Sequence, residues 1–200
     1  MKRVSLLLCA LLVLSIAGFG QTLTPADREK GAQYLQQTRD GVVAATKGLS
    51  EAQLKFKSAP DRWSVAEVLE HIALAEDFLL QNVTDKIMKA PAGAADRDIP
   101  KIDAMVLAMI PDRSHKAQAP QPLVPTGRWT PAETLDHFLK SRAKTIEFLD
   151  STPDLRAHVA DSPLGQSMDA YEWLLFVAAH SERHTKQILE VKADPNFPKN

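Results

Sequence analysis

Two histidines four residues apart, His180 and His184, are the residues whose spacing most clearly indicates chemistry. On a helix, residues at i and i+4 lie one above the other on the same face, so both imidazoles can reach one metal ion. An H-x-x-x-H pair is a weak motif when it stands alone. A pair of core histidines satisfied by hydrogen bonds, or a partly hydrated pair at the edge of the core, explains the spacing equally well.

A third histidine, His71, lies in a separate helical pattern with apolar residues around it. His180 and His184 likewise fall on an apolar stripe that should face the interior of a bundle. Buried neutral imidazoles without partners are costly, because each ring has a donor and an acceptor to satisfy. We therefore predict a metal site formed by His71, His180 and His184 from two facing helices, with an open position for water or substrate.

The other histidines lack such surroundings. His137 lies off the apolar face of its helix, while His115 and His158 fall in predicted loops. Isolated polar residues at such positions are usually exposed, so we predict that all three are surface residues.

Two glutamates near the histidines, Glu182 and Glu67, are candidates for catalytic groups. Glu182 gives the sequence H-S-E-R-H, but in the zincin motif the glutamate follows the first histidine directly. Here Glu182 comes two residues after His180 and therefore points to another side of the helix, so we predict that it is a solvated surface charge. Glu67, one turn before His71, is the best local candidate for a base. Its spacing from Ser64 also fits a helix capping box, which is the interpretation we favour.

Four long helical patterns must position these residues. The first three start with an N-cap residue, with proline next or an acidic residue three positions on. The fourth has Asp169 in its expected first turn, where the helix dipole favours a negative charge. The predicted helices run from Thr24 to about Leu49, from Ser64 to about Ala90, from Thr130 to Ser151, and from near Ser167 to Asp194.

The stretch from Pro91 to Trp129 is too long for a simple turn between bundle helices. Within it, Ile102 to Ile110 has the pattern of one short helix. A connection of this length lets the third long helix lie parallel to the second. The sequence thus predicts an all-α four-helix bundle with a long crossover connection between helices 2 and 3, and no sheet of consequence.

The first twenty residues have the pattern of a secretory signal. Lys2 and Arg3 precede an apolar run, and Gly18 and Gly20 provide the small residues required for cleavage. A retained membrane anchor is the alternative, although the run is at the short limit for spanning a bilayer. We expect residues 1–20 to be removed, leaving domain 21–200 in a periplasmic or secreted protein.

Composition narrows the function further. The only cysteine, Cys9, lies in the predicted signal, so the mature domain would contain no disulfide and no thiol nucleophile. With 24 basic and 25 acidic residues and no basic run, the chain shows no electrostatic pattern for nucleic acid or an anionic membrane. The expected partner is a small-molecule ligand or substrate, and a homodimer is compatible with the sequence.

The segments Asp61–Ala73 and Ala179–Ile188 resemble the two signatures of the DinB-like family of four-helix-bundle metalloproteins, the second being H-x-x-x-H followed by Gln-Ile. The similarity extends from Thr24 to Lys192 and includes Pro163-Leu164-Gly165. It implies a divalent metal, commonly zinc or nickel, held by His71, His180 and His184. Relatives include thiol-dependent S-transferases and isomerases; predicted export argues against that activity, because such thiols are mainly cytosolic.

Three functions remain open at this point. One is an exported metal-dependent hydrolase or group transferase with an open three-histidine site. A second is a non-catalytic bundle that binds a small ligand or uses its metal structurally. A third is an interaction protein with a vestigial metal site. Structural metal sites usually have four protein ligands, and only three candidates are found here, which favours the first.

Overall fold

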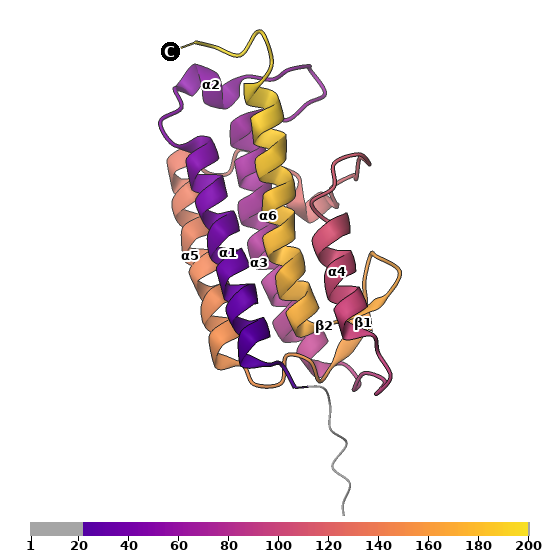
Figure 1. The fold of residues 1–200 in the computed structure, drawn as a ribbon. Coiled ribbons are helices and arrows are strands. Elements are labelled where there is room, and N and C mark those ends of the chain that lie inside the picture. The colour runs from indigo at the N-terminus through magenta and orange to yellow at the C-terminus, as the bar shows by residue number, and fades with distance from the viewer. Residues whose placement is uncertain (1–21, 200) are drawn as a thin grey trace, which may run out of the picture.

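Four long helices run side by side along the molecule: α1 (Pro25–Thr46), α3 (Val65–Asp85), α5 (Pro131–Ser151) and α6 (Ala170–Lys192). They are seen in a computed structural model that describes residues 22–199, with α1 and α6 running one way and α3 and α5 the other (Figure 1). The predicted signal peptide lies outside the described residues. Among the described residues, no helix is both long and apolar enough to cross a membrane.

Side-chain caps set the starts of these helices. Thr24, Ser64, Thr130 and Asp169 each accept a hydrogen bond from the backbone N–H three residues later. All but the first are closed into capping boxes by a glutamate that returns a bond to the cap residue. The cap patterns in the sequence were therefore reliable guides to where α1, α3 and α5 begin.

The first two predicted helices end earlier than expected. Helix α1 stops at Thr46, and Gly48 then adopts a left-handed conformation (φ 73°) that favours glycine. A separate short helix, α2 (Glu51–Lys55), follows with its own capping box from Ser50. Helix α3 ends at Asp85, and the predicted last turn is instead a 3₁₀ helix, η1 (Ile87–Lys89).

The predicted start of the last helix near Ser167 is wrong by three residues. Ser167–Asp169 form strand β2, which pairs antiparallel with β1 (Val159–Asp161) across a turn. Gly165, with φ of 72°, lies in that turn. The acidic Asp169, expected inside the first helical turn, is the N-cap itself. This two-stranded sheet is small, and the fold remains that of an all-α bundle.

The long crossover between the second and third bundle helices is confirmed. After α3 the chain forms α4 (Ile99–Met109), which packs beside α6, and then η2 (Gln121–Leu123) before α5 begins. Helix α4 starts one turn earlier than predicted because Asp98 caps it and Pro100 occupies its first turn. The crossover brings the chain back to the end of the bundle where α3 begins, so α5 runs parallel to α3 and packs against α3 and α1.

The bundle core is divided by a polar layer. Two separate clusters of buried apolar residues occupy the two ends, one containing Val42, Leu69 and Ile188, the other Leu35, Leu79 and Leu174. Between these clusters or beside them, toward the middle of the bundle, lie the buried polar side chains that we call the polar layer: Thr38, His71, Glu76, Ser141, Arg142, Thr145, Ser181 and His184. The partly exposed His180 belongs to the same level of α6.

Arg142 is the centre of one half of this layer. Its side chain is fully buried and forms a bidentate pair with Glu76, with both N–O distances at 2.7 Å. Its remaining N–H groups donate to the Leu35 carbonyl and to the hydroxyls of Thr38 and Ser181. The network joins α1, α3, α5 and α6, and sequence analysis did not anticipate it.

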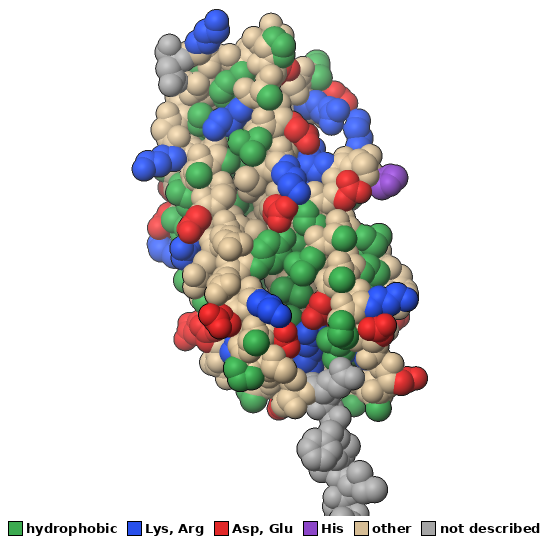
Figure 2. Space-filling model, viewed as in Figure 1, with side chains coloured by type: hydrophobic (Ala, Val, Ile, Leu, Met, Phe, Trp, Pro, Cys, Tyr) green, Lys and Arg blue, Asp and Glu red, His purple; other side chains and the backbone are tan. Residues whose placement is uncertain are grey.

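The surface carries charges of both signs. On the face shown in Figure 2, basic and acidic side chains are interspersed, and hydrophobic ones gather where α4 lies against α6. Exposed apolar side chains on these two helices include Leu107, Met109 and Leu189.

Candidate metal centre

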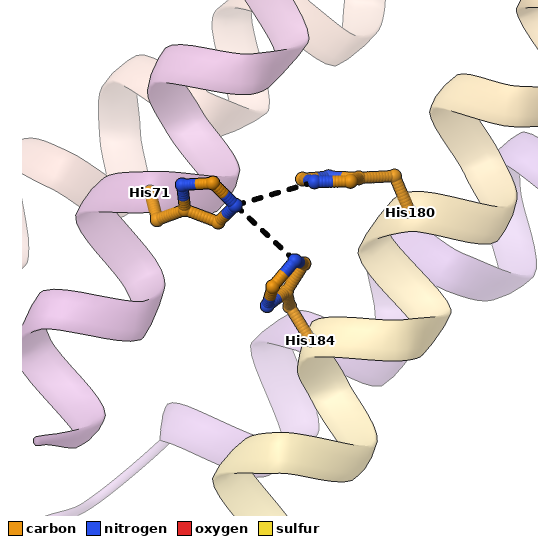
Figure 3. A group of neighbouring side chains, drawn as sticks. All are labelled: His71, His180 and His184. Atoms are coloured by element: carbon orange, nitrogen blue, oxygen red, sulfur yellow. Dashed lines mark hydrogen bonds between the residues drawn. The ribbon is translucent and has the colours of Figure 1, made fainter. Parts of the chain in front are cut away.

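His71, His180 and His184 converge at one point between α3 and α6 (Figure 3). The Nε2 atom of His71 lies 3.2 Å from the Nε2 atoms of both His180 and His184. His71 and His184 are buried, whereas His180 is partly exposed. The structure thus brings together the three histidines that were singled out in the sequence, although His71 precedes the other two by more than a hundred residues.

A backbone carbonyl group determines which ring nitrogen of His71 carries the proton. Its Nδ1 lies 2.8 Å from the carbonyl oxygen of Leu123 in η2. A carbonyl oxygen can only accept, so Nδ1 carries the proton and donates it. In the neutral ring the other nitrogen, Nε2, then presents a lone pair toward His180 and His184.

His184 is oriented in the same sense by a side chain. Its Nδ1 lies 2.8 Å from Oε1 of Gln187, one turn further along α6. Arg113 from the crossover donates to the same Oε1 at 3.4 Å, which supports the placement of the amide oxygen rather than the nitrogen at that point. Nδ1 of His184 therefore donates, and its Nε2 also faces the cluster with a lone pair.

The environment keeps all three imidazoles neutral. Burial lowers the pKa of His71, an effect that the hydrogen bond to Leu123 partly opposes. Burial, followed by repulsion from charged forms of His184 and His71, lowers the pKa of His180 well below its usual value. Burial is also the main reason why the pKa of His184 falls to about 3. Near neutral pH the cluster consists of three neutral imidazoles, the form that binds metal ions.

Aromatic side chains flank the cluster. The ring of Trp63, just before α3, lies 4.9 Å from that of His71, and Phe176 stacks beside His180 at 6.3 Å. Trp173 continues this row along α6, 5.3 Å from Phe176. His180 is the most exposed of the three histidines.

The two glutamates considered in the sequence have other partners. The carboxylate of Glu67 accepts from the Ser64 backbone N–H at 2.7 Å and pairs with Lys57 at 2.7 Å, so the capping interpretation is confirmed. Glu182 does point away from the histidines, but it is not a free surface charge. It accepts a 2.7 Å hydrogen bond from Tyr34 of α1 and pairs with Lys186.

The other histidines stay outside the cluster, as predicted, although only His115 is fully exposed. His137 is half-buried, stacks on Trp129 and lies 2.6 Å from the carboxylate of Asp77. His158 is also half-buried, because its Nδ1 donates to the Ala90 carbonyl beside the small sheet. The prediction that these two are plain surface residues is corrected on this point.

Sequence analysis missed the groups that orient the ligands. The Leu123 carbonyl is a backbone group whose position has no side-chain signature. Gln187 belongs to the DinB-like signature, which does not indicate its role. Its spacing of three residues from His184 is the signal that could have revealed the contact. A third contact is made by the buried Glu70, which accepts from the backbone N–H groups of Thr126 and Gly127 and so holds the end of the crossover against α3.

Comparison with known proteins bears on the family and the fold. The chain is 25% identical over 148 residues to the uncharacterized protein YuaE of Bacillus subtilis (strain 168), which covers 73% of this chain and 87% of YuaE. The fold is similar to that of YfiT from Bacillus subtilis, described as a probable metal-dependent hydrolase with an unusual four-helix bundle topology. The TM-score is 0.56 at 14% sequence identity, covering 89% of this chain and 93% of YfiT. The DinB superfamily model matches residues 34–188, which include all three clustered histidines, and the chain therefore belongs to the DinB superfamily.

Proposed function

We propose that this protein is a divalent-metal-dependent hydrolase or group transferase whose ion is held by His71, His180 and His184. The observation that carries the proposal is the direction of the lone pairs. The Nε2 atoms of His71 and His184 both lack a proton and yet lie 3.2 Å apart. Two lone pairs facing each other in a buried site repel, and a shared cation removes that repulsion.

The spacing of the nitrogens suits a metal ion. Imidazole nitrogens bind zinc at about 2.0–2.1 Å, which in a tetrahedral site places neighbouring ligand atoms about 3.3 Å apart. The two measured separations of 3.2 Å are close to that value. Three neutral imidazoles suit zinc or nickel, and zinc is our first choice.

An ion held by three protein ligands keeps at least one open position, where it acts as a Lewis acid toward water or a substrate oxygen. The chain's own residues would hold and orient the ligands: Leu123 fixes the ring of His71, and Gln187 fixes that of His184. Phe176 and Trp63 would cover the cluster and limit the access of bulk water. A small-molecule substrate with an apolar part beside the reacting group fits such surroundings.

Hydrolysis is the reaction class we favour. YfiT is described as a probable metal-dependent hydrolase, and it has the same fold. Export, which we also propose, supports the same preference because low-molecular-weight thiols for group transfer are mainly cytosolic. Glu67 is unsuited to serve as the base, because both the Ser64 N–H and Lys57 occupy its carboxylate.

The alternative is a non-catalytic bundle with a structural or vestigial metal. The partial exposure of His180 favours the open site over a structural one, since structural sites are closed by four protein ligands.

The test is a metal titration followed by a turnover assay. Chelator-treated protein should bind one Zn²⁺ or Ni²⁺ per chain, and His71→Ala should abolish stoichiometric binding. His137→Ala is the matched control, because it removes a half-buried histidine that lies outside the cluster. We expect metal-dependent turnover of ester or amide substrates. Binding without turnover of any ester, amide or thiol substrate would favour the alternative, and full binding by His71→Ala would refute the triad.

Export is tested separately. The protein should be recovered outside the cytoplasm with an intact mass that begins at or near Gln21. Recovery from the cytoplasm with Met1 retained would contradict export and would restore thiol transfer as a candidate.

A further inference from the structure

We infer that Arg113 and Gln187 form a positioning pair through which the crossover connection sets the metal affinity of His184. The inference rests on the proposed metal site and concerns two residues that do not touch the ion. Gln187 contacts the ring of His184 directly, and Arg113 contacts Gln187 from a segment more than seventy residues earlier in the chain.

The contacts form a short chain toward the cluster. Arg113 is bound on its other side by Glu190, with a bidentate pair at 2.6 and 2.7 Å. This pair holds the guanidinium over α6, from where Nη1 donates to Oε1 of Gln187 at 3.4 Å. With its oxygen held in place, the Gln187 amide can only accept from Nδ1 of His184. The metal-facing Nε2 of His184 is thereby kept free of a proton.

The segment that carries Arg113 is itself tied to α6. Arg183 donates to the carbonyl oxygens of Asp112 and His115, the latter at 2.6 Å. Lys186 lies 3.4 Å from the carbonyl oxygen of Pro111. Residues 111–115 are therefore docked on the outer side of the helix that carries His180 and His184. This docking places Arg113 within reach of Gln187.

The crossover consequently contacts two of the three proposed ligands by independent routes. Leu123, near its end, accepts from Nδ1 of His71, and Arg113, near its middle, acts on His184 through Gln187. Groups that orient a metal-bound histidine typically change metal affinity about 10- to 100-fold when removed. A connection that supplies such groups to both α3 and α6 is part of the site rather than a linker.

The experiment measures Zn²⁺ affinity by competition with a chelator. Gln187→Met keeps the volume of the side chain but removes its acceptor, and we expect affinity to fall about 10- to 100-fold. Gln187→Glu keeps an acceptor and should retain the wild-type affinity or exceed it. Arg113→Ala acts one contact further away and should weaken binding about 3- to 10-fold. Arg39→Ala, which breaks a surface ion pair with Asp40 on α1, is the matched control and should change nothing.

A double substitution separates positioning from general structural damage. If Arg113 acts through Gln187, adding Arg113→Ala to Gln187→Met should cause no further loss of affinity, because the two effects share one contact. The melting temperatures of the metal-free variants should match that of the metal-free wild type, while the increase on adding Zn²⁺ becomes smaller.

The possible failures are distinct. Full affinity of Gln187→Met, or equal effects of Arg113→Ala and Arg39→Ala, would overturn the positioning pair while the metal site stands. Additive losses in the double variant would show that Arg113 acts independently of Gln187 and would also overturn it. A wild-type protein that binds no Zn²⁺ would refute the proposed function and this inference together.

Discussion

The polar layer of the core has two halves, which differ in how their buried polar groups are paired. Around Arg142, every N–H of the guanidinium has an acceptor and both oxygens of Glu76 have donors. Around the histidines, the outward Nδ1 atoms of His71 and His184 are bound, but the inward Nε2 atoms meet only each other and His180. Buried polar groups in proteins are normally paired. The first half is complete in itself, whereas the second would be completed by the metal ion that we propose.

The largest change in the free energy of unfolding should come from a substitution in the Arg142 half. Arg142→Met leaves the carboxylate of Glu76 buried without its cation, and we expect a loss of about 3–5 kcal/mol in the free energy of unfolding. Urea denaturation of the metal-free protein measures it. Adding Glu76→Leu removes the unpaired charge and should recover much of the loss. A loss below about 1 kcal/mol in the single variant would show that the network contributes little.

In the histidine half, a comparable substitution should hardly change the free energy of unfolding until metal is added. His180→Leu replaces the partly exposed ring of the three with an apolar side chain, so the unfolding free energy of the metal-free protein should stay within about 1 kcal/mol of wild type. With metal at a hundredfold excess over its dissociation constant, the wild type gains about 2.7 kcal/mol, and the variant should not. Equal metal-induced stabilisation of both proteins would contradict the proposed ligand set.

Acid should weaken the histidine half in a defined window. The folded-state pKa of His184 is about 3, below its unfolded value near 6.5, because burial disfavours the charged ring. The unfolded chain then binds more protons than the folded one, so stability is lost as the pH falls from 6.5 toward 3. Each such histidine contributes a slope of up to about 1.4 kcal/mol per pH unit.

The slope is measured by denaturation of chelator-treated protein between pH 6.5 and 5, above the range in which most carboxylates titrate. His184→Gln should lower the slope by about one proton relative to wild type. An unchanged slope would mean that His184 takes up a proton in the folded protein as readily as in the unfolded one.

The smallest effects concern the helix cap beside the site. Ser64→Ala removes the N-cap of α3 and should cost about 1 kcal/mol, with unchanged metal affinity. Glu67→Gln keeps a residue that can complete the capping box, and its exposed pair with Lys57 is worth little. Stability and any metal-dependent turnover should therefore survive this change. Loss of turnover alone would assign Glu67 the role of base after all.

The two halves also differ in how far the sequence predicts them. His71, His180 and His184 stand out because helical spacing and apolar neighbours identify the inward face. Arg142 and Glu76 lie on equally inward positions, but charged residues on a helix are normally read as solvent-facing. Their pairing joins residues 66 positions apart, and no local pattern reports such a contact.

Helix starts were predicted well because caps are local, whereas errors occurred where a local signal was weak or overridden. The capping-box residues Ser50 and Gln53 mark the start of α2, but they follow the predicted end of the first helix, in a stretch where no helix was predicted. Ser167 was taken as a helix start, but its backbone pairs with Asp161 in a hairpin whose register depends on the turn at Gly165. The long-range contacts that orient the ligands through the crossover were beyond local patterns altogether.

The order of the helices determines when the proposed metal ligands become available during synthesis. The rest of α3, the crossover and α5 separate His71 from His180, which are 109 residues apart in the chain. At a synthesis rate of about 5–20 residues per second, roughly 5–20 s pass between the emergence of the first ligand and that of the second. Helix α6 also packs between α1 and α3, so the core closes only when this late segment arrives. On the proposed ligand set, metal would therefore bind only late in the synthesis of the chain, and truncation before α6 should leave an unfolded product with no affinity for the ion.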